Sequence, residues 1–212
     1  SQAQDRFRIM GPDYLTQMIL PPVLGQIFRL APRVQIDIEN LSEDAIADLC
    51  DGKISLGFGV VEYGPVLENV RSQALLRDRQ VCLMRRGHPL CDGGMTLAGY
   101  AAASHALLSI TGKGGGWIDD TLKQHGLTRT IALRITHFLT ISAVIAATDL
   151  VITVPELLAR QVMTEDLRLV PPPEELQAPA FTVSQIWHER FTEDPAHQWL
   201  RRLVKSACQP SG

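Results

Sequence analysis

Residues Val34–Val60, with the sequence VQIDIENLSEDAIADLCDGKISLGFGV, decide the fold class of this chain. The stretch opens with apolar residues at every second position, which is the pattern of a strand with one buried face: Val34, Ile36 and Ile38. It closes with the apolar run 54–60, and an amphipathic segment lies between the two runs. The stretch therefore predicts a strand, a helix and a second strand. A short unit of this kind favours a right-handed crossover and a parallel sheet.

The predicted helix has signals at both of its ends. Ser42 is a typical capping residue, and Glu43 and Asp44 follow it in the first turn, where carboxylates interact favourably with exposed N–H groups. Gly52 is expected to end the helix. Three local signals thus agree on the start of this helix.

The composition excludes several classes of function. Of the 212 residues, 45% are hydrophobic and 20% are charged, which is ordinary for a globular protein. The net charge of −3 gives no basic surface for a nucleic-acid backbone, so we expect that this chain does not itself bind DNA. It contains neither a run long enough to span a bilayer nor the pattern of a secretory signal, so we expect a cytoplasmic protein with no membrane association.

Cysteine and histidine spacing gives no sign of a metal or cofactor site. The four cysteines are scattered without a C-x-x-C pair and are expected to be reduced thiols: Cys50, Cys82, Cys91 and Cys208. The histidines show neither H-x-x-x-H nor H-E-x-x-H spacing. No G-x-S-x-G motif is present, and we expect no cofactor and no enzymatic activity.

The beginning of the chain predicts one α/β lobe. A strand at 7–10 precedes a helical region at 15–30, which we expect to kink or restart at Pro21-Pro22 because each proline removes a backbone donor. After the central unit, extended segments at 66–73 and 79–84 are expected to pair. A basic turn at 85–89 is then expected to leave the lobe.

The same pattern starts again after this turn and predicts a second lobe. Strands are expected at 106–110, 130–136 and 150–154, and helices at 117–125, 138–148 and 156–163, with 138–148 apolar nearly all round. After the run Pro171-Pro172-Pro173, one strand at 181–188 and one helix opened by Asp194-Pro195 are too little to form a further lobe. We therefore expect a discontinuous first lobe (1–88 and 180–212), a second lobe (89–179) and two crossovers.

A series of short motifs runs along the chain in a fixed order. The series comprises Pro21-Pro22 ahead of Ala31-Pro32 and Val34, Leu49-x-x-Gly52 before 54–59, Arg86-Gly87-His88-Pro89-Leu90, Gly126-Leu127-x-Arg129, Thr148-Asp149-Leu150 with Thr153-Val154-Pro155, and Trp187-His188-x-Arg190 with Asp194-Pro195-Ala196-His197-x-Trp199-Leu200-Arg201. In this order and spacing they resemble the effector-binding domain of LysR-type transcriptional regulators. The segment 187–201 is most similar to the branch that contains nodulation and aromatic-catabolism regulators.

The resemblance implies an α/β fold of two Rossmann-like lobes, like type 2 periplasmic binding proteins, with a ligand cleft between the lobes. It implies a small-molecule effector, a homodimer or tetramer, and DNA binding only through a winged helix-turn-helix that this chain does not contain. The dimer would form through segments 14–30 and 34–50. Two positions depart from the family pattern: Ser55, where aspartate is usual, and Lys113, where the related branch tends to have histidine.

Two segments of the first lobe are candidate effector contacts. Gly11-Pro12-Asp13 follows the first strand and precedes a helix, where backbone N–H groups can hold a polar or anionic ligand. The alternative is a plain turn in which Asp13 caps the helix. Ile19 lines the cleft by resemblance, although an apolar helical position is more often core.

Two segments of the second lobe are further candidates. Thr111 and Lys113 lie in a glycine-rich loop that suits a carboxylate, or that is simply solvent-facing. Thr136-His137-Phe138 lies between a strand and a helix, where His137 would donate a hydrogen bond and Phe138 would offer an aromatic face. The alternative is a structural histidine.

Two other functions remain open at the level of sequence. A transport-associated solute-binding protein has the same two-lobe topology, but it should come from a secreted precursor. An enzyme on this fold, such as an aromatic-amino-acid dehydratase, is the third possibility, but its Thr-Arg-Phe motif is missing here.

Overall fold

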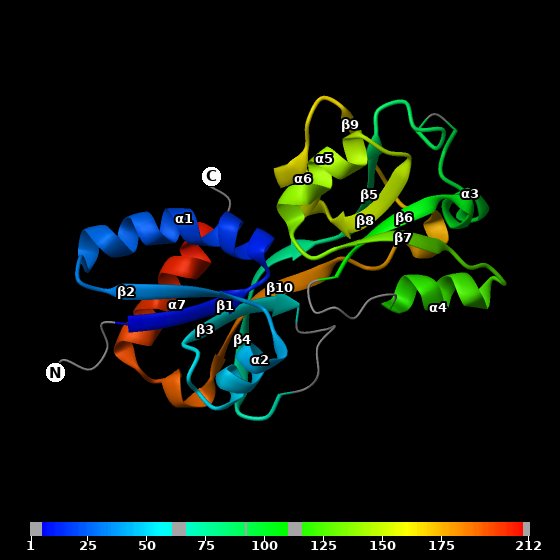
Figure 1. Ribbon diagram of the computed structural model, residues 1–212. Coiled ribbons are helices and arrows are strands. Elements are labelled where there is room, and N and C mark those ends of the chain that lie inside the picture. The colour runs from blue at the N-terminus through cyan, green and yellow to red at the C-terminus, as the bar shows by residue number, and fades with distance from the viewer. Residues whose placement is uncertain (1–5, 61–66, 92, 110–115, 210–212) are drawn as a thin grey trace. The chain divides into compact units, whose positions relative to one another are not determined.

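The computed structural model describes residues 6–60, 67–91, 93–109 and 116–209, and these contain two five-stranded sheets (Figure 1). The chain divides into two compact units. The first unit joins Ser1–Arg77 to Phe181–Gly212, and the second unit is Asp78–Ala180.

The sheet of the first unit has the strand order β2-β1-β3-β10-β4. Strand β1 pairs in parallel with β2 on one side and with β3 on the other, and β10 runs antiparallel to β3. The strands are β1 (Arg6–Gly11), β2 (Gln35–Asn40), β3 (Leu56–Val60), β4 (Val70–Asp78) and β10 (Phe181–His188). Because β10 lies between β3 and β4, the end of the chain is an integral part of this sheet.

The predicted strand-helix-strand unit is present as β2, α2 (Glu43–Cys50) and β3. The Ser42 hydroxyl caps α2 by accepting a hydrogen bond from the Ala45 N–H at 3.0 Å. Gly52 follows the helix with a φ of +69°, a conformation that favours glycine. Strand β1 lies between β2 and β3, so the crossover through α2 passes over one strand.

Helix α1 (Asp13–Leu30) is continuous through Pro21-Pro22, so the expected restart is wrong, whereas the kink stays a prediction. Both prolines are exposed. The carbonyl groups that lose their N–H partners therefore lie near water, which satisfies them without a break in the helix.

Helices cover both faces of the first sheet. Met10 and Ile186 pack with α2 on one face. The neighbouring Gln185 points to the other face, where its amide donates to the Arg201 carbonyl of α7 (Pro195–Ala207) at 3.1 Å. Helix α1 contacts α7, and Figure 1 shows α1 and α2 on opposite sides of the sheet.

The sheet of the second unit has the order β7-β6-β8-β5-β9. Strand β6 pairs in parallel with β7 and β8, whereas β5 is antiparallel to β8 and β9. The strands are β5 (Gln80–Arg85), β6 (Ser104–Leu108), β7 (Thr130–Ile135), β8 (Leu150–Pro155) and β9 (Leu167–Val170). The helices are α3 (Leu97–Ala102), α4 (Gly116–Gln124), α5 (Ile141–Ala146) and α6 (Glu156–Val162).

Strands β4 and β5 belong to different sheets, so the expectation that these segments pair with each other is wrong. Since β5 is hydrogen-bonded between β8 and β9, it belongs to the second unit, and the first boundary falls after Arg77 instead of after His88. Strand β9 and helix α3 are further elements that the sequence pattern did not predict.

The segment predicted as one helix at 138–148 is shorter and less buried than expected. It begins with a single 3₁₀ turn, η2 (Phe138–Thr140), and continues as α5. Its buried residues include Phe138 and Ile141, whereas Leu139 is 74% exposed. The segment is therefore buried on one side and not on several sides, as its apolar composition had suggested.

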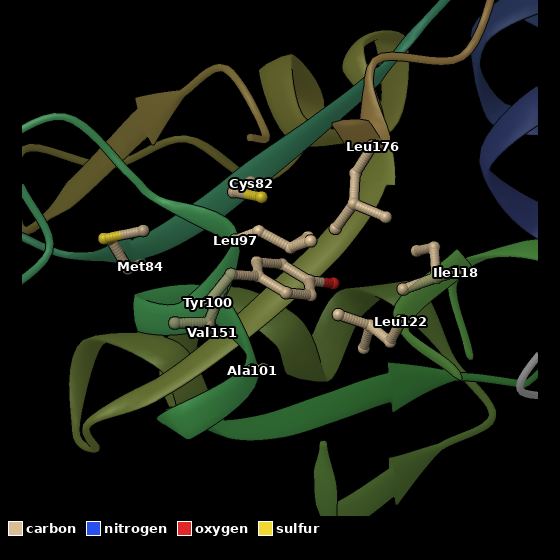
Figure 2. Close-up of a cluster of buried hydrophobic side chains, with 9 residues drawn as sticks. All are labelled: Cys82, Met84, Leu97, Tyr100, Ala101, Ile118, Leu122, Val151 and Leu176. Atoms are coloured by element: carbon tan, nitrogen blue, oxygen red, sulfur yellow. The ribbon is translucent and has the colours of Figure 1, made fainter. Parts of the chain in front are cut away.

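Figure 2 shows the buried cluster on one face of the second sheet, with Tyr100 at its centre. The Tyr100 ring comes from α3 and packs between side chains of β5, β8 and α4. The cluster is formed by Cys82, Met84, Leu97, Tyr100, Ala101, Ile118, Leu122, Val151 and Leu176. A helix absent from the sequence prediction thus supplies the centre of this core.

Asp78 caps helix α6 from a distant part of the chain. The helix has no side-chain cap of its own at Pro155. Instead, the Asp78 carboxylate accepts hydrogen bonds from the N–H groups of Leu157 at 3.3 Å and Arg79 at 2.8 Å. Burial raises the pKa of this carboxyl group, although these N–H groups oppose the shift.

Every helix in the described residues lacks the length or the apolar character that crossing a lipid bilayer requires.

Candidate functional site

The turn Gly11-Pro12-Asp13 lies at the carboxyl end of β1, where open α/β sheets commonly bind ligands. Gly11 is tightly enclosed, because a Cβ atom there would lie 3.2 Å from Phe58 and 3.3 Å from Thr16. Pro12, and not Asp13, is the N-cap residue of α1, and its carbonyl accepts the Thr16 N–H at 3.1 Å.

Asp13 is the first residue of α1, so its predicted role as the cap residue is wrong. Its carboxylate accepts a hydrogen bond from the Tyr14 N–H at 2.9 Å. Ile19 is 2% exposed and belongs to the core of the first unit, which is the alternative that we favoured. Gly11 and Pro12 are buried, so the partly buried Asp13 is the most accessible of these candidates.

The turn Thr136-His137-Phe138 lies at the carboxyl end of β7, which runs parallel to β6. Thr136 and His137 are exposed, and the His137 ring has no hydrogen-bond partner among the described residues. The His137 carbonyl accepts from the Thr140 hydroxyl at 3.0 Å, which fixes the backbone of the turn. Phe138 is only 3% exposed, so the structure buries the ring that we expected to face a ligand.

Thr111 and Lys113 lie outside the described residues, so their predicted role stays a prediction. The described chain stops at Ser109 and resumes at Gly116. Ser109 is buried, and its N–H donates to the Ile135 carbonyl at 2.8 Å. Ser109 therefore lies beside the end of β7, at the residue that precedes Thr136.

The motif residues at 187–201 form a buried network around Arg201 of α7. The Arg201 guanidinium lies 4.2 Å from the Trp187 ring centroid. It donates to the carbonyl groups of Phe191 at 3.1 Å and Thr192 at 2.8 Å, and to His197 Nδ1 at 2.8 Å. No carboxylate bonds to it among the described residues, and burial lowers the pKa of Arg201.

His197 must be neutral in this network. Its Nδ1 accepts from Arg201, while its Nε2–H donates to the Ser55 carbonyl at 2.6 Å. Its ring stacks on Phe191 with centroids 5.1 Å apart and an interplanar angle of 2°. Burial lowers the pKa of His197, and the charge of Arg201 adds to this effect. The motif that most distinguishes the sequence is therefore a framework of the first unit.

The second unit buries a different arginine network around Arg129. The Arg129 side chain is 2% exposed, and it bonds to both carboxylate oxygens of Asp119 at 2.7 and 3.3 Å. Its Nη1 donates to the Tyr100 hydroxyl at 3.1 Å, which in turn lies 2.8 Å from the Thr153 hydroxyl. Burial alone lowers the pKa of Arg129, but the bond to Asp119 raises it overall.

His105 lies next to this network and is fully buried. Its Nε2 bonds to the Tyr100 carbonyl at 2.7 Å, and its Nδ1 has no partner among the described residues. Burial lowers the pKa of His105 to about 4, so the imidazole is neutral at physiological pH. A neutral buried histidine of this kind supports the fold of the unit.

The Arg86-Gly87-His88 motif is also structural. The buried His88 ring accepts from the Leu90 N–H at Nδ1 (3.1 Å) and bonds through Nε2 to the Asp149 carbonyl (3.2 Å). Arg85 adds an ion pair to the Asp149 carboxylate at 2.5 Å. Two motifs that are far apart in the sequence therefore hold each other at the end of β5.

Two hollows occur in the second unit. One, of about 620 Å³, is open and lined by His88, Leu90, Gly99 and Asp149 among others, and the polar groups of its histidine are already bonded. The other, of about 470 Å³, lies where β9 ends and is lined in part by Arg79. The sequence pattern did not predict the second hollow. The pair Pro171-Pro172, which follows the last residue of β9, is the sequence feature that could have indicated it.

The described part of the chain contains no cluster of metal-binding side chains. No group of three histidine, cysteine, aspartate or glutamate residues there can hold a metal ion. Burial raises the pKa of the Cys82 thiol to about 12 and also raises the pKa of Cys208. These two thiols therefore stay protonated and unreactive at neutral pH.

A family model described as the LysR substrate binding domain matches residues 1–209. Among curated proteins, the HTH-type transcriptional regulator SyrM of Rhizobium meliloti is 32% identical over 99% of this chain and 64% of its own length. The HTH-type transcriptional activator NagR of a Ralstonia species is 29% identical over 93% of this chain and 65% of its own length. The chain thus spans less than two thirds of these relatives.

Solved structures agree with this match. The regulatory domain of MexT, a transcriptional activator in Pseudomonas aeruginosa, superposes with a TM-score of 0.79. It is 28% identical, and the match covers 95% of this chain and 97% of that domain. The two five-stranded sheets are therefore those of a periplasmic-binding-protein-like type 2 fold, and these relatives are transcriptional regulators.

Proposed function

Because the chain belongs to the family of LysR substrate-binding domains, we propose that it is the effector-sensing domain of a LysR-type DNA-binding transcriptional regulator. It binds a small aromatic or carboxylate-bearing molecule in a cleft between its two lobes. DNA is bound by a winged helix-turn-helix that lies outside these residues, and the regulator works in the cytoplasm.

The exposed turn at Thr136 and His137 is the observation that carries this proposal. It sits at the carboxyl end of a parallel strand, and its imidazole is free to bond to a ligand. The turn Gly11-Pro12-Asp13 occupies the equivalent place after β1 in the first unit. One such turn in each unit is what a ligand that contacts two lobes requires.

The mechanism of the proposed sensor is a population shift. An effector that touches both lobes favours one lobe arrangement over another. Only the difference between its affinities for the two arrangements can change the regulator. The effector therefore acts on the equilibrium and does not need to create a new conformation.

A ligand screen tests the proposal directly. Aromatic acids and flavonoid-like compounds are screened by thermal shift, since a ligand at a hundred times its Kd adds about 2.7 kcal/mol of stability. For any compound that binds, His137→Ala should weaken binding by at least about 1 kcal/mol in calorimetry. The exposed His125, in the turn directly after α4, is the matched control, and His125→Ala should leave the affinity unchanged.

Two outcomes would contradict this assignment. A broad screen that stabilises nothing would remove the proposed effector class. An unchanged affinity in folded His137→Ala protein would make His137 a structural residue. Lys113→Ala adds a further test, because an anionic ligand should lose affinity both in this variant and with added salt.

We also propose that the chain forms a homodimer through α1 and β2, as a dimer or as half of a tetramer. Large apolar side chains are exposed on these elements: Phe28 (48%), Leu30 (67%) and Ile38 (51%). A two-fold interface uses the same patch on both subunits. Val23 and Ile27, on the same helix, are buried in the unit itself and are not available to such an interface.

Light scattering of the isolated chain tests the dimer. We expect Phe28→Asp to shift the mass from that of a dimer to the 23.4 kDa of the monomer. Gln17→Asp, an exposed polar position on the same helix, should leave the dimer intact. A wild-type mass of 23.4 kDa at high concentration would contradict the proposal.

A further inference from the structure

The cavity beside β5 exists because its neighbouring strand ends early. The pairing of β5 with β9 covers Cys82 to Arg85, whereas Gln80 and Val81 pair with β8 alone. The chain that should continue β9 instead runs into Pro171-Pro172, and proline cannot donate to a strand ladder. The gap that results is a cavity of about 470 Å³, within the range of small-molecule pockets.

Arg79 gives this cavity a cation with unused donors. Its Nε donates to the Glu156 carboxylate at 2.5 Å, and its terminal nitrogens have no partner among the described residues. The same carboxylate also accepts from Arg160 at 2.5 Å. Two guanidinium groups thus share the Glu156 carboxylate, and the Asp78 carboxylate is a second negative charge beside Arg79.

Two amides complete the polar side of the cavity. The Gln80 side chain has no hydrogen-bond partner among the described residues, and Gln177 uses its amide nitrogen on the Pro172 carbonyl at 3.2 Å, which leaves its oxygen available. The remaining wall is apolar and includes Val81 and the two prolines. An apolar wall with a few convergent polar groups is the usual make-up of a ligand site.

We propose that this cavity is a second small-molecule site, which takes a compact apolar carboxylate held by Arg79. The planar guanidinium matches a carboxylate through paired N–H bonds, and the terminal nitrogens of Arg79 have no other partner among the described residues. None of the proposed effector contacts lines this cavity, so the inference goes beyond the proposed function.

The test is an NMR titration of the ¹⁵N-labelled 212-residue chain with benzoate, with uncharged benzamide as the matched ligand. Benzoate should shift the amide signals of Gln80, Val81, Gln177 and Ala178, and benzamide should bind at least tenfold more weakly. Shifts at Thr136 to Phe138 would instead report the proposed effector turn, so each site can fail without the other. Absence of benzoate shifts at the cavity residues up to millimolar concentration overturns the inference.

Variants separate Arg79 from its neighbour. Arg79→Gln should weaken benzoate binding at the cavity about tenfold or more, whereas Arg160→Gln should leave it unchanged, because Arg160 shares Glu156 but does not line the cavity. Ala178→Phe should abolish the cavity shifts by filling the space. The two variants are independent, so a folded form of either decides the matter. Wild-type affinity in folded Arg79→Gln or Ala178→Phe protein overturns the assignment.

Discussion

Each unit contains a buried arginine in contact with an aromatic side chain, but different groups stabilise the two guanidinium charges. In the first unit Arg201 donates to two carbonyl groups and a neutral histidine, without a carboxylate partner among the described residues. In the second unit Arg129 bonds to both oxygens of Asp119. The Arg201 charge is thus stabilised mainly by backbone carbonyl groups, whereas the Arg129 charge is stabilised by the side chain of Asp119.

This difference shows how vulnerable each unit is to a single substitution. The carbonyl groups around Arg201 come from the 3₁₀ turn η4 (Glu189–Phe191) and the residue after it, so no side-chain replacement can remove them. Asp119 on α4 is one substitution away from leaving a buried charge unpaired. Breaking a buried pair costs far more than the pair itself contributes.

The largest effect should come from Asp119→Ala. It leaves the buried Arg129 charge without its carboxylate, and we expect the free energy of unfolding to fall by about 3 kcal/mol. Urea denaturation measures the change, and Asp120→Ala, an exposed neighbour on the same helix, is the control. Equal stability of the two variants would show that Tyr100 and solvent are enough to hold the charge.

A smaller loss is expected for Arg201→Met in the first unit. The methionine keeps an apolar stem against Trp187 but removes the donors to the Phe191 and Thr192 carbonyls, which should cost about 2 kcal/mol. Hydrogen exchange should rise locally at 191–194, while exposed Arg202→Met changes neither quantity. A loss greater than that of Asp119→Ala would reverse the comparison.

Tyr100→Phe tests the edge of the second network. The variant keeps the ring at the centre of the core but removes the hydroxyl that bonds to Arg129 and Thr153, with an expected cost of about 1 kcal/mol. A double-mutant cycle with Asp119→Ala should show non-additive costs, because both groups contact the same guanidinium. Strict additivity would mean that the hydroxyl and the carboxylate act independently.

The two units should also respond to acid through His105 and His197. Burial lowers both pKa values in the folded state, so the unfolded chain binds more protons below its ordinary pKa of about 6.5. Stability should therefore fall as the pH drops from 7 towards 5, by about 2 kcal/mol for His105, whose folded pKa is about 4. His105→Gln should flatten this dependence of the unfolding free energy, whereas exposed His125→Gln should not.

The sequence predicted correctly those features that depend on neighbouring residues, such as helix caps. The Ser42 cap and the Asp194 cap are both present, and the Asp194 carboxylate accepts from the His197 N–H at 2.8 Å. The order of strands and helices in the first unit also follows from hydrophobic periodicity. Pro21-Pro22 did not restart the helix, because proline is tolerated inside a helix where the lost hydrogen bonds face water.

Non-local contacts account for what the sequence could not predict. Strand β9 is short and is held by its pairing with β5, and α3 is fixed by packing of Tyr100. At the candidate site, the pattern placed His137 on an exposed turn but gave no means of knowing that Phe138 is buried. The framework role of Arg201 depends on residues brought together by the fold, and no spacing rule describes them.

The Asp78 cap has a practical consequence for dissecting the protein. An excised second unit that begins after His88, where the sequence suggested the boundary, would lack β5 and would also leave the amino end of α6 without its carboxylate. A fragment that begins at Asp78 keeps both. The residue that ends one strand thus sets the latest point at which the chain can be cut to yield an autonomous second unit.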